Sequence, residues 1–493
     1  MFKQISHLTL TGVILTTITA CVSVGPDYQK PIVTPSQSWS SKADLRQAVL
    51  GKWWRSFNDP VLERLVTDGI ASNTSVAEAK AKVRLSRAQL AAKSGSQFPT
   101  LDSETGMKRS DSAGTIATNS ASQLFTTRWE LDLFGGNRRS VEAAYYNVEA
   151  VDEQMRAVLV IVIGDIATNY AHLREIQENI RIARRTVTSQ KNTADLTRTQ
   201  LAAGQVSQVD LLSAQTQVAS TLSQIPLMQI EYAKYLNNLA VLTGRSAVAL
   251  AVELRKPAPI PKIPRSVPSG LPAELLDSRP DLRAAERAFA SSTARVGQAQ
   301  AALYPSLSLT GNIGTSGANF GDLARLSNII WSVGPTLSIP IFEGGKLNAE
   351  LTIARANRDQ SFISYRRAIL TALSEVEKAS VALNQNRLRY VQLRTIVNNN
   401  RKINTLMIEQ FKAGNKSFIE VLTAQRDLFA SETAFNAAGT DLVLSYIALQ
   451  KALGGGWDGR IDTSTPEIVD TNTKPHFTTN LSDTFSAPGS RLR

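Results

Sequence analysis

Two acidic residues occupy matching places in the chain, and no other side chains show an equally regular spacing suited to chemistry. Asp210 lies three residues after Ser207, and Glu420 lies three residues after Ser417, so that 210 residues separate the two pairs. This spacing is typical of a capping box, in which the acid accepts a hydrogen bond from a backbone N–H at the start of a helix. Repeated around a symmetry axis, the same carboxylates would form a ring that favours cations. Both interpretations remain open at this point.

The usual reagents of enzyme chemistry are scarce. The 493 residues include one cysteine and three histidines, and only His172 and His476 follow the first 20 residues. Neither histidine has metal-ligand spacing, and we find no nucleophile elbow and no phosphate-binding loop. We therefore expect no enzyme, no metal and no cofactor. The net charge of +12 would permit nucleic acid as a partner, but the N-terminal export signal described below argues against it.

The body of the chain contains an internal sequence repeat. Ala203-Gly204 returns as Ala413-Gly414, and Asp210-Leu211-Leu212 returns as Glu420-Val421-Leu422. Such self-similarity indicates an internally duplicated architecture. We assign residues 62–250 to the first repeat and 273–457 to the second. A proline-rich linker, 251–272, separates them, and a polar tail, 458–493, follows.

Very long helices dominate both repeats. The stretches Asn137–Ala203 and Lys346–Ala413 contain no proline, and each would extend roughly 100 Å at about 1.5 Å per residue. Gly204 and Gly414 are placed as left-handed helix caps, and Ser207 and Ser417 begin the returning helices. The pattern predicts two antiparallel helical hairpins of the coiled-coil type.

Each repeat also predicts a shorter helix and two strands. The helices span Leu62–Lys93 and Asp281–Ala302. Apolar and polar residues alternate around Phe125–Leu133 and Trp331–Ile341, as in strands of a transmembrane barrel, and Phe125, Trp129 and Trp331 could lie at a membrane interface. A half-buried soluble sheet, with these aromatics in its core, fits the pattern as well. The partner strands lie near residues 99–110 and 305–316. Four strands cannot close a barrel, whereas three copies would supply 12.

The N-terminus predicts export and lipidation. Residues 1–20 form a signal peptide that ends in Ile18-Thr19-Ala20-Cys21, which resembles a bacterial lipobox. Cys21 would carry a covalent lipid, and 21–61 would form a lipid-anchored segment. Val22, in place of an aspartate, is typical of lipoproteins sent to the outer membrane.

At this point the sequence resembles a known family, the TolC-type outer-membrane efflux proteins, in particular their lipoprotein (NodT-like, OprM-like) branch. The motifs that carry the resemblance extend over nearly the whole mature chain: Val24-Gly25-Pro26-Asp27-Tyr28, Trp53-Trp54, Ser278-Arg279-Pro280-Asp281-Leu282, the Phe-Gly-Gly turns and Ala452-Leu453-Gly454-Gly455-Gly456-Trp457. The resemblance implies a homotrimer in the cell outer membrane, with a 12-stranded transmembrane β-barrel (four strands per chain) continued by an α-helical tunnel across the periplasm. It further implies a passive duct for drugs or other small toxic compounds, with a periplasmic adaptor and an inner-membrane pump of the RND or MFS type as partners.

The resemblance also assigns roles to individual residues. It places adaptor contacts at the hairpin tips, which here contain Gly204, Gln205, Ser207, Gly414, Asn415 and Ser417, although turn chemistry alone explains the glycines and serines. Relatives often carry an acid where this chain has Thr423, which puts an acidic gate in doubt at that position. Arg426 is a candidate inter-chain partner. The segments of the long helices that lead to the hairpin tips carry an excess of positive charge, +6 over 384–416 and +3 over 174–204. This excess fits either an electrostatic role or a solvated helix face.

Two rival functions remain at this stage. The chain could be a related outer-membrane channel that exports proteins or metal ions. From a different class, the chain could be a lipid-tethered periplasmic coiled-coil scaffold whose sheets are soluble.

Overall fold

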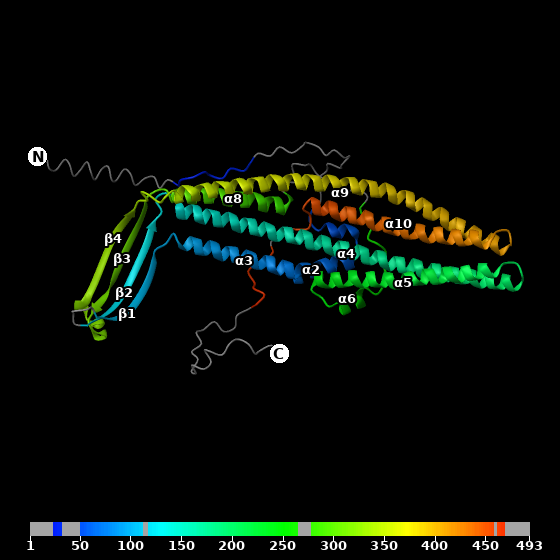
Figure 1. Ribbon diagram of the computed structural model, residues 1–493, viewed down its shortest axis with the longest axis horizontal. Coiled ribbons are helices and arrows are strands. Elements are labelled where there is room, and N and C mark those ends of the chain that lie inside the picture. Colours follow the sequence, from blue (N-terminus) through cyan, green and yellow to red (C-terminus); the bar gives the residue numbers. More distant parts are fainter. Residues whose placement is uncertain (1–22, 32–49, 112–116, 265–277, 458–460, 469–493) are drawn as a thin grey trace.

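The computed structural model describes residues 23–31, 50–111, 117–264, 278–457 and 461–468. The chain is elongated, with a small sheet at one end and two helical hairpins that reach the other end (Figure 1). No helix within these ranges is both long enough and apolar enough to cross a membrane.

The sheet contains four antiparallel strands in the order β1-β2-β3-β4, two from each repeat. The strands are β1 (Thr100–Ser110), β2 (Thr118–Leu131), β3 (Ser306–Gly317) and β4 (Ile329–Ser338). Each sequence-predicted strand is present, although β2 begins earlier than the alternation indicated and β4 ends before Ile341. Strands β1 and β4 each have an edge that pairs with no other described strand.

One face of the sheet is an apolar surface open to its surroundings. Phe125, Ile313 and Trp331 lie opposite one another on three successive strands, and so share a face. Trp331 is 71% exposed, and Ile313 and Phe125 are also exposed. Of the two alternatives for Phe125, Trp129 and Trp331, the one that makes them ordinary core residues is therefore wrong, since all three are exposed. An apolar sheet face without a covering layer is typical of a lipid-facing surface.

The two longest helices agree closely with the predicted ones. α4 (Gly136–Ala202) and α9 (Lys346–Lys412) have 67 residues each, or about 100 Å at the usual rise. The returning helices are α5 (Gln208–Thr243) and α10 (Phe418–Ala452). α5 continues through Pro226 to its end.

The shorter helices differ more from the prediction. The stretch 62–93 is not one helix but two, α2 (Pro60–Ser72) and α3 (Thr74–Gly95). The break lies at Asn73, because its side chain accepts hydrogen bonds from the backbone N–H groups of Ser75 and Val76 and so caps a new helix. In the second repeat, α8 (Pro280–Ala301) is continuous, as expected.

One predicted domain boundary needs correction. The linker does not begin at residue 251, because helix α6 (Ala247–Leu254) extends into it and buries Leu250 and Leu254. Within the predicted polar tail, the described residues 461–468 pack on the helices, since Arg87 Nη1 donates to the side chain of buried Thr463 at 2.7 Å. Both segments are anchored by contacts with distant parts of the chain, which local composition does not reveal.

The main core lies on one side of the long helices. The 3-10 helix η1 (Trp53–Phe57) places Trp53 against Tyr446 of α10, and Tyr170 of α4 donates to Asp59 Oδ2 at 2.6 Å. Burial of each such aromatic contributes about 1.5–3 kcal/mol. η1, α2 and α6 thus form an additional layer over one face of the helical array.

The duplication is visible where each returning helix ends. Asn73 Nδ2 donates to the carbonyl of Leu242 at 2.9 Å, and Arg279 Nη1 donates to the carbonyl of Ala452 at 2.7 Å. The two accepting residues are again 210 positions apart. In both repeats, a side chain just before a helix next to the sheet (α3 or α8) thus binds the end of the returning helix (α5 or α10).

The segment 23–31 lies against the junction of the sheet and the helices. Val24 N–H donates to Phe134 O at 3.1 Å, and Asp27 pairs with the buried guanidinium of Arg139 at 2.6 Å. Tyr28 donates to the buried carboxylate of Glu286. Cys21 and the signal peptide lie outside the described residues.

Candidate functional site

The candidate site is built at the hairpin tips, residues 203–207 and 413–417. Gly204 has φ 71° and Gly414 has φ 75°, a left-handed conformation that favours glycine. The N–H groups of Gln205 and Asn415 each donate to the carbonyl five residues earlier, Gln200 O and Gln410 O, both at 2.9 Å. This pattern matches the Schellman motif. The predicted glycine caps are confirmed.

Asp210 and Glu420 are both capping residues. Asp210 Oδ2 accepts from Ser207 N–H at 2.9 Å, and Glu420 Oε2 accepts from Ser417 N–H at 3.0 Å. This bears out the capping interpretation for both repeats. A cap at the tip does not exclude a place on a pore lining, because only one lone pair of each carboxylate is engaged in the bond to the backbone.

The second tip carries a charge pair that the first lacks. Lys416 Nζ lies 2.6 Å from Glu420 Oε1. Lys416, together with the Ser417 N–H, lowers the pKa of Glu420 to about 2. Glu420 therefore stays ionised throughout the physiological pH range. Lys416 was not singled out by the sequence, although its position four residues before Glu420 was an available signal.

The next turn of α10 holds Thr423 and Arg426, which make contacts within the chain. Thr423 Oγ1 donates to Ile419 O at 2.9 Å, a bond to its own helix. Arg426 Nε donates to Gln217 Oε1 of α5 at 2.7 Å. Arg426 thus connects the two hairpins of one chain, whereas the sequence had made it a candidate partner between chains.

The surface of both tips is exposed. Gly204, Gln205, Ser207, Gly414, Asn415 and Ser417 are all open to solvent. Beneath the tips, Phe411, Phe418 and Val421 are buried in a small hydrophobic cluster. The tips thus have a fixed backbone above a packed base, which is an arrangement suited to docking.

The two hairpins meet along an α4–α10 interface that includes several buried polar side chains of α10. Gln425 Nε2 donates to Thr193 Oγ1 at 2.9 Å, and Asn436 Nδ2 donates to Asn179 Oδ1 at 2.8 Å. Between them, Glu432 is 4% exposed and binds Arg185. Sequence reasoning missed this interface, for which the only signal was polar residues recurring on an otherwise apolar helix face.

The profile of the family described as "Outer membrane efflux protein" matches residues 65–245 and 271–455. The two matched stretches coincide with the two structural repeats. The chain belongs to the outer membrane efflux protein family.

Relatives match over nearly their full length. Nodulation protein T of Rhizobium leguminosarum bv. trifolii is 30% identical, over 90% of this chain and 96% of the relative. The solvent efflux pump outer membrane protein SrpC of Pseudomonas putida is 31% identical, over 88% and 95%. The solved outer-membrane channel OprN is 31% identical, with a TM-score of 0.83 over 88% of this chain and 99% of that structure.

These comparisons confirm the predicted fold class. The chain has the mainly α-helical, internally duplicated fold of the trimeric TolC-type outer-membrane channels, in which each protomer supplies four strands to a shared 12-stranded barrel. The family and its structural neighbours are channels of the outer membrane that extend into the periplasm. The rival interpretation as a coiled-coil scaffold with soluble sheets is not supported by these relatives.

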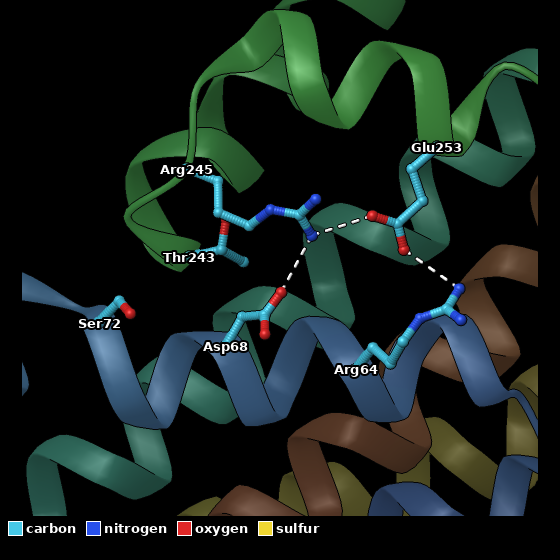
Figure 2. A pocket seen from close by; sticks show the side chains of 6 residues that line it. All are labelled: Arg64, Asp68, Ser72, Thr243, Arg245 and Glu253. Carbon is cyan, nitrogen blue, oxygen red and sulfur yellow. Dashed lines mark hydrogen bonds and ion pairs between the residues drawn. The ribbon is translucent and has the colours of Figure 1, made fainter.

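A second cluster of charged side chains lies at the end of the first returning helix of this family member. Figure 2 shows Arg245 between Asp68 and Glu253, with both ion pairs at 2.9 Å, and Arg64 beside Glu253 at 3.1 Å. The two cations and two anions neutralise one another. The cluster therefore fastens α6 to α2 and leaves no free charge for a ligand.

The remaining candidates for chemistry have structural roles. His172 stacks on Tyr235, with ring centroids 4.8 Å apart, and its Nδ1 lies 3.2 Å from Glu175. In the part of the chain that the structure describes, no group of histidine, cysteine and acidic side chains could hold a metal ion.

Proposed function

We propose that the chain is the outer-membrane exit duct of a tripartite efflux pump. Three copies would enclose one channel, which conducts small toxic compounds passively from an inner-membrane transporter and a periplasmic adaptor to the outside. The duplicated hairpin architecture, with an open apolar sheet at one end and helices of 67 residues beyond it, is the observation that carries this proposal.

Stoichiometry follows from the sheet edges. An unpaired strand edge cannot remain in a hydrocarbon environment, because no water is present to satisfy its backbone groups. Neighbouring copies would pair β1 of one chain with β4 of the next, so that three copies close a 12-stranded barrel. The lower helices of the three copies would form the tunnel wall in the periplasm.

The tips would contact the adaptor. Their backbone is rigid, their polar groups face outward, and the Lys416–Glu420 pair gives the second tip a charge pattern different from that of the first. The inner-membrane partner would be a pump of the RND or MFS type. Covalent lipid on Cys21 would provide a further outer-membrane anchor.

Relatives named for solvent and toluene efflux support small, largely apolar organic compounds as cargo, drugs included. A host strain that lacks its own exit duct, complemented with this chain and a matched adaptor and pump, tests the proposal. We expect lower accumulation of a fluorescent pump substrate and a channel conductance when the purified protein is placed in planar bilayers. Conductance without any change in accumulation would support a channel but contradict a place in efflux.

A further inference from the structure

A cavity of about 740 Å³ lies in the second repeat, at the junction between the start of α8 and the end of α10. The long helices α4 and α9 run past this point, whereas α10 ends at Ala452 and α8 begins at Pro280. The gap between the two shorter helices leaves the hollow. In the first repeat the matching junction has a pocket lined by the charged cluster of Figure 2, so the two repeats differ in chemistry at equivalent places.

The floor of the cavity is apolar and rich in alanine. Its lining includes Ala157, Val160, Ala382, Leu444, Ile447 and Ala448. The hollow exists because alanines stand where larger residues would fill the space between α4 and α9.

Within the described part of the chain, the charged side chains at the rim of the cavity are paired, with the exception of Lys378. Arg279 is engaged by Asp281 and Glu375, both at 2.7 Å, and Lys451 pairs with Asp165 at 3.0 Å. Lys378 also lines the cavity, is exposed, and forms no ion pair or hydrogen bond with the described part of the chain. One cation at the rim is thus available to an incoming anion.

The cavity opens on the side of α10 that faces away from η1, and Ala379, Ile447 and Ala452 of its lining are shared with the main core. On α10, Tyr446 lies against Trp53 of η1, whereas Ala448 and Lys451 project from the opposite side of the helix. Since η1, α2 and α6 cover only the core side, a tunnel wall one helix thick would turn the cavity toward the lumen. This orientation rests on the proposed function, while the existence of the cavity does not.

We propose that this cavity binds small amphipathic anions, with the apolar body on the alanine floor and the anionic group at Lys378. Lipids of the bilayer are a poor match, because Ala157 lies 21 residues beyond the start of α4, or about 30 Å from the sheet. In an assembled duct, the three copies would place three such sites around the lumen and favour this class of compound among the cargo.

Binding is tested with the full chain in nanodiscs of zwitterionic lipid, using fluorescence anisotropy of 1-pyrenesulfonate and subtracting protein-free nanodiscs. A cationic analogue with the same ring system, 1-pyrenemethylammonium, separates the charge preference from apolar binding. We expect saturable binding of the anion, and binding of the cation at least tenfold weaker. Equal binding of the two probes, or no saturable binding, overturns the proposal.

Two variants locate the site. Lys378→Gln removes the free cation and should weaken anion binding about tenfold, as expected for loss of a charge-assisted contact. Ala448→Phe fills the cavity from its exposed side and should weaken the binding of both probes. Lys402→Gln and Ala356→Phe, exposed positions of α9 outside the cavity, are the matched controls and should bind as the parent does. Loss of binding in the controls, or full binding in Lys378→Gln and Ala448→Phe, contradicts the site.

Measuring conductance in planar bilayers, beside probe binding, distinguishes a failure of this inference from a failure of the proposed function. A protein that conducts but does not bind 1-pyrenesulfonate is a duct without the site. One that binds the probe but does not conduct has the site without the proposed function.

Discussion

Glu432 Oε2 of α10 lies 2.5 Å from Arg185 Nη2 of α4, while Glu432 Oε1 lies 2.9 Å from Arg401 Nε of α9. One buried carboxylate thus connects both hairpins of the chain. A duct that opens by loosening its hairpins must either break this contact or move the connected helices together.

Replacing Glu432 with alanine should loosen the hairpins. The substitution leaves two arginines without their partner, and we expect a loss of about 1–3 kcal/mol in stability, together with a larger conductance in bilayers. Glu409→Ala, an exposed acid on α9, is the control. Thermal unfolding and single-channel recording provide the two measurements, and a variant with unchanged conductance would show that the contact does not restrain opening.

Glu420 should stabilise the second tip in a pH-dependent manner. Because Lys416 and the Ser417 N–H lower its pKa to about 2, the stabilisation is complete above the ordinary glutamate pKa of 4.5 and is lost as the pH falls toward 2. Hydrogen exchange of the peptide spanning 413–421 should be faster in Glu420→Gln than in the parent at pH 7. This difference should be constant down to about pH 4.5 and vanish near pH 2. A difference that does not change with pH would exclude the charge pair as its cause.

The tip glycines should resist substitution for conformational reasons. Nothing lies within 4 Å of a Cβ added at Gly204 or Gly414, so the cost of alanine comes from the positive φ alone, about 1–2 kcal/mol for each position. Gly95→Ala, also in open space but without a positive φ, should be neutral or slightly stabilising. Local hydrogen exchange at both tips would measure the effect, and equal behaviour of all three variants would contradict the turn assignment.

Lipidation of Cys21 is a separate prediction. In cells grown with labelled palmitate, the parent should incorporate the label and Cys21→Ser should not, because the chain has no other cysteine. Ser23→Ala keeps the thiol and serves as the control. We expect Cys21→Ser still to assemble, since Asp27 and Tyr28 hold the N-terminal segment through their own contacts. Label retained by Cys21→Ser would rule out this attachment site.

The parts of the fold that local chemistry determines could be predicted from the sequence. The limits of α4 and α9 agree with the expected ones to within one residue, because helix formers without proline end at Gly204 and Gly414. The capping role of Ser207 and Ser417 depends on residues only three positions away, and it could therefore also be predicted from the sequence.

What depended on distant contacts could not be predicted. The Glu432–Arg185 pair joins residues 247 positions apart, and no pattern in the sequence pairs them. Thr463 is buried where Arg84 and Arg87 of α3 bind its segment. The cavity beside Lys378 arises from the spacing of α8 and α10 between two continuous helices, a feature of three-dimensional packing alone.

Single-particle electron microscopy of the full chain, extracted from the outer membrane, tests the central claim most directly. We predict particles with threefold symmetry, a barrel at one end and a continuous central channel, extending about 100 Å or more beyond the barrel, as the length of α4 and α9 requires. Monomers, or rods of any stoichiometry without a central channel, would contradict the account.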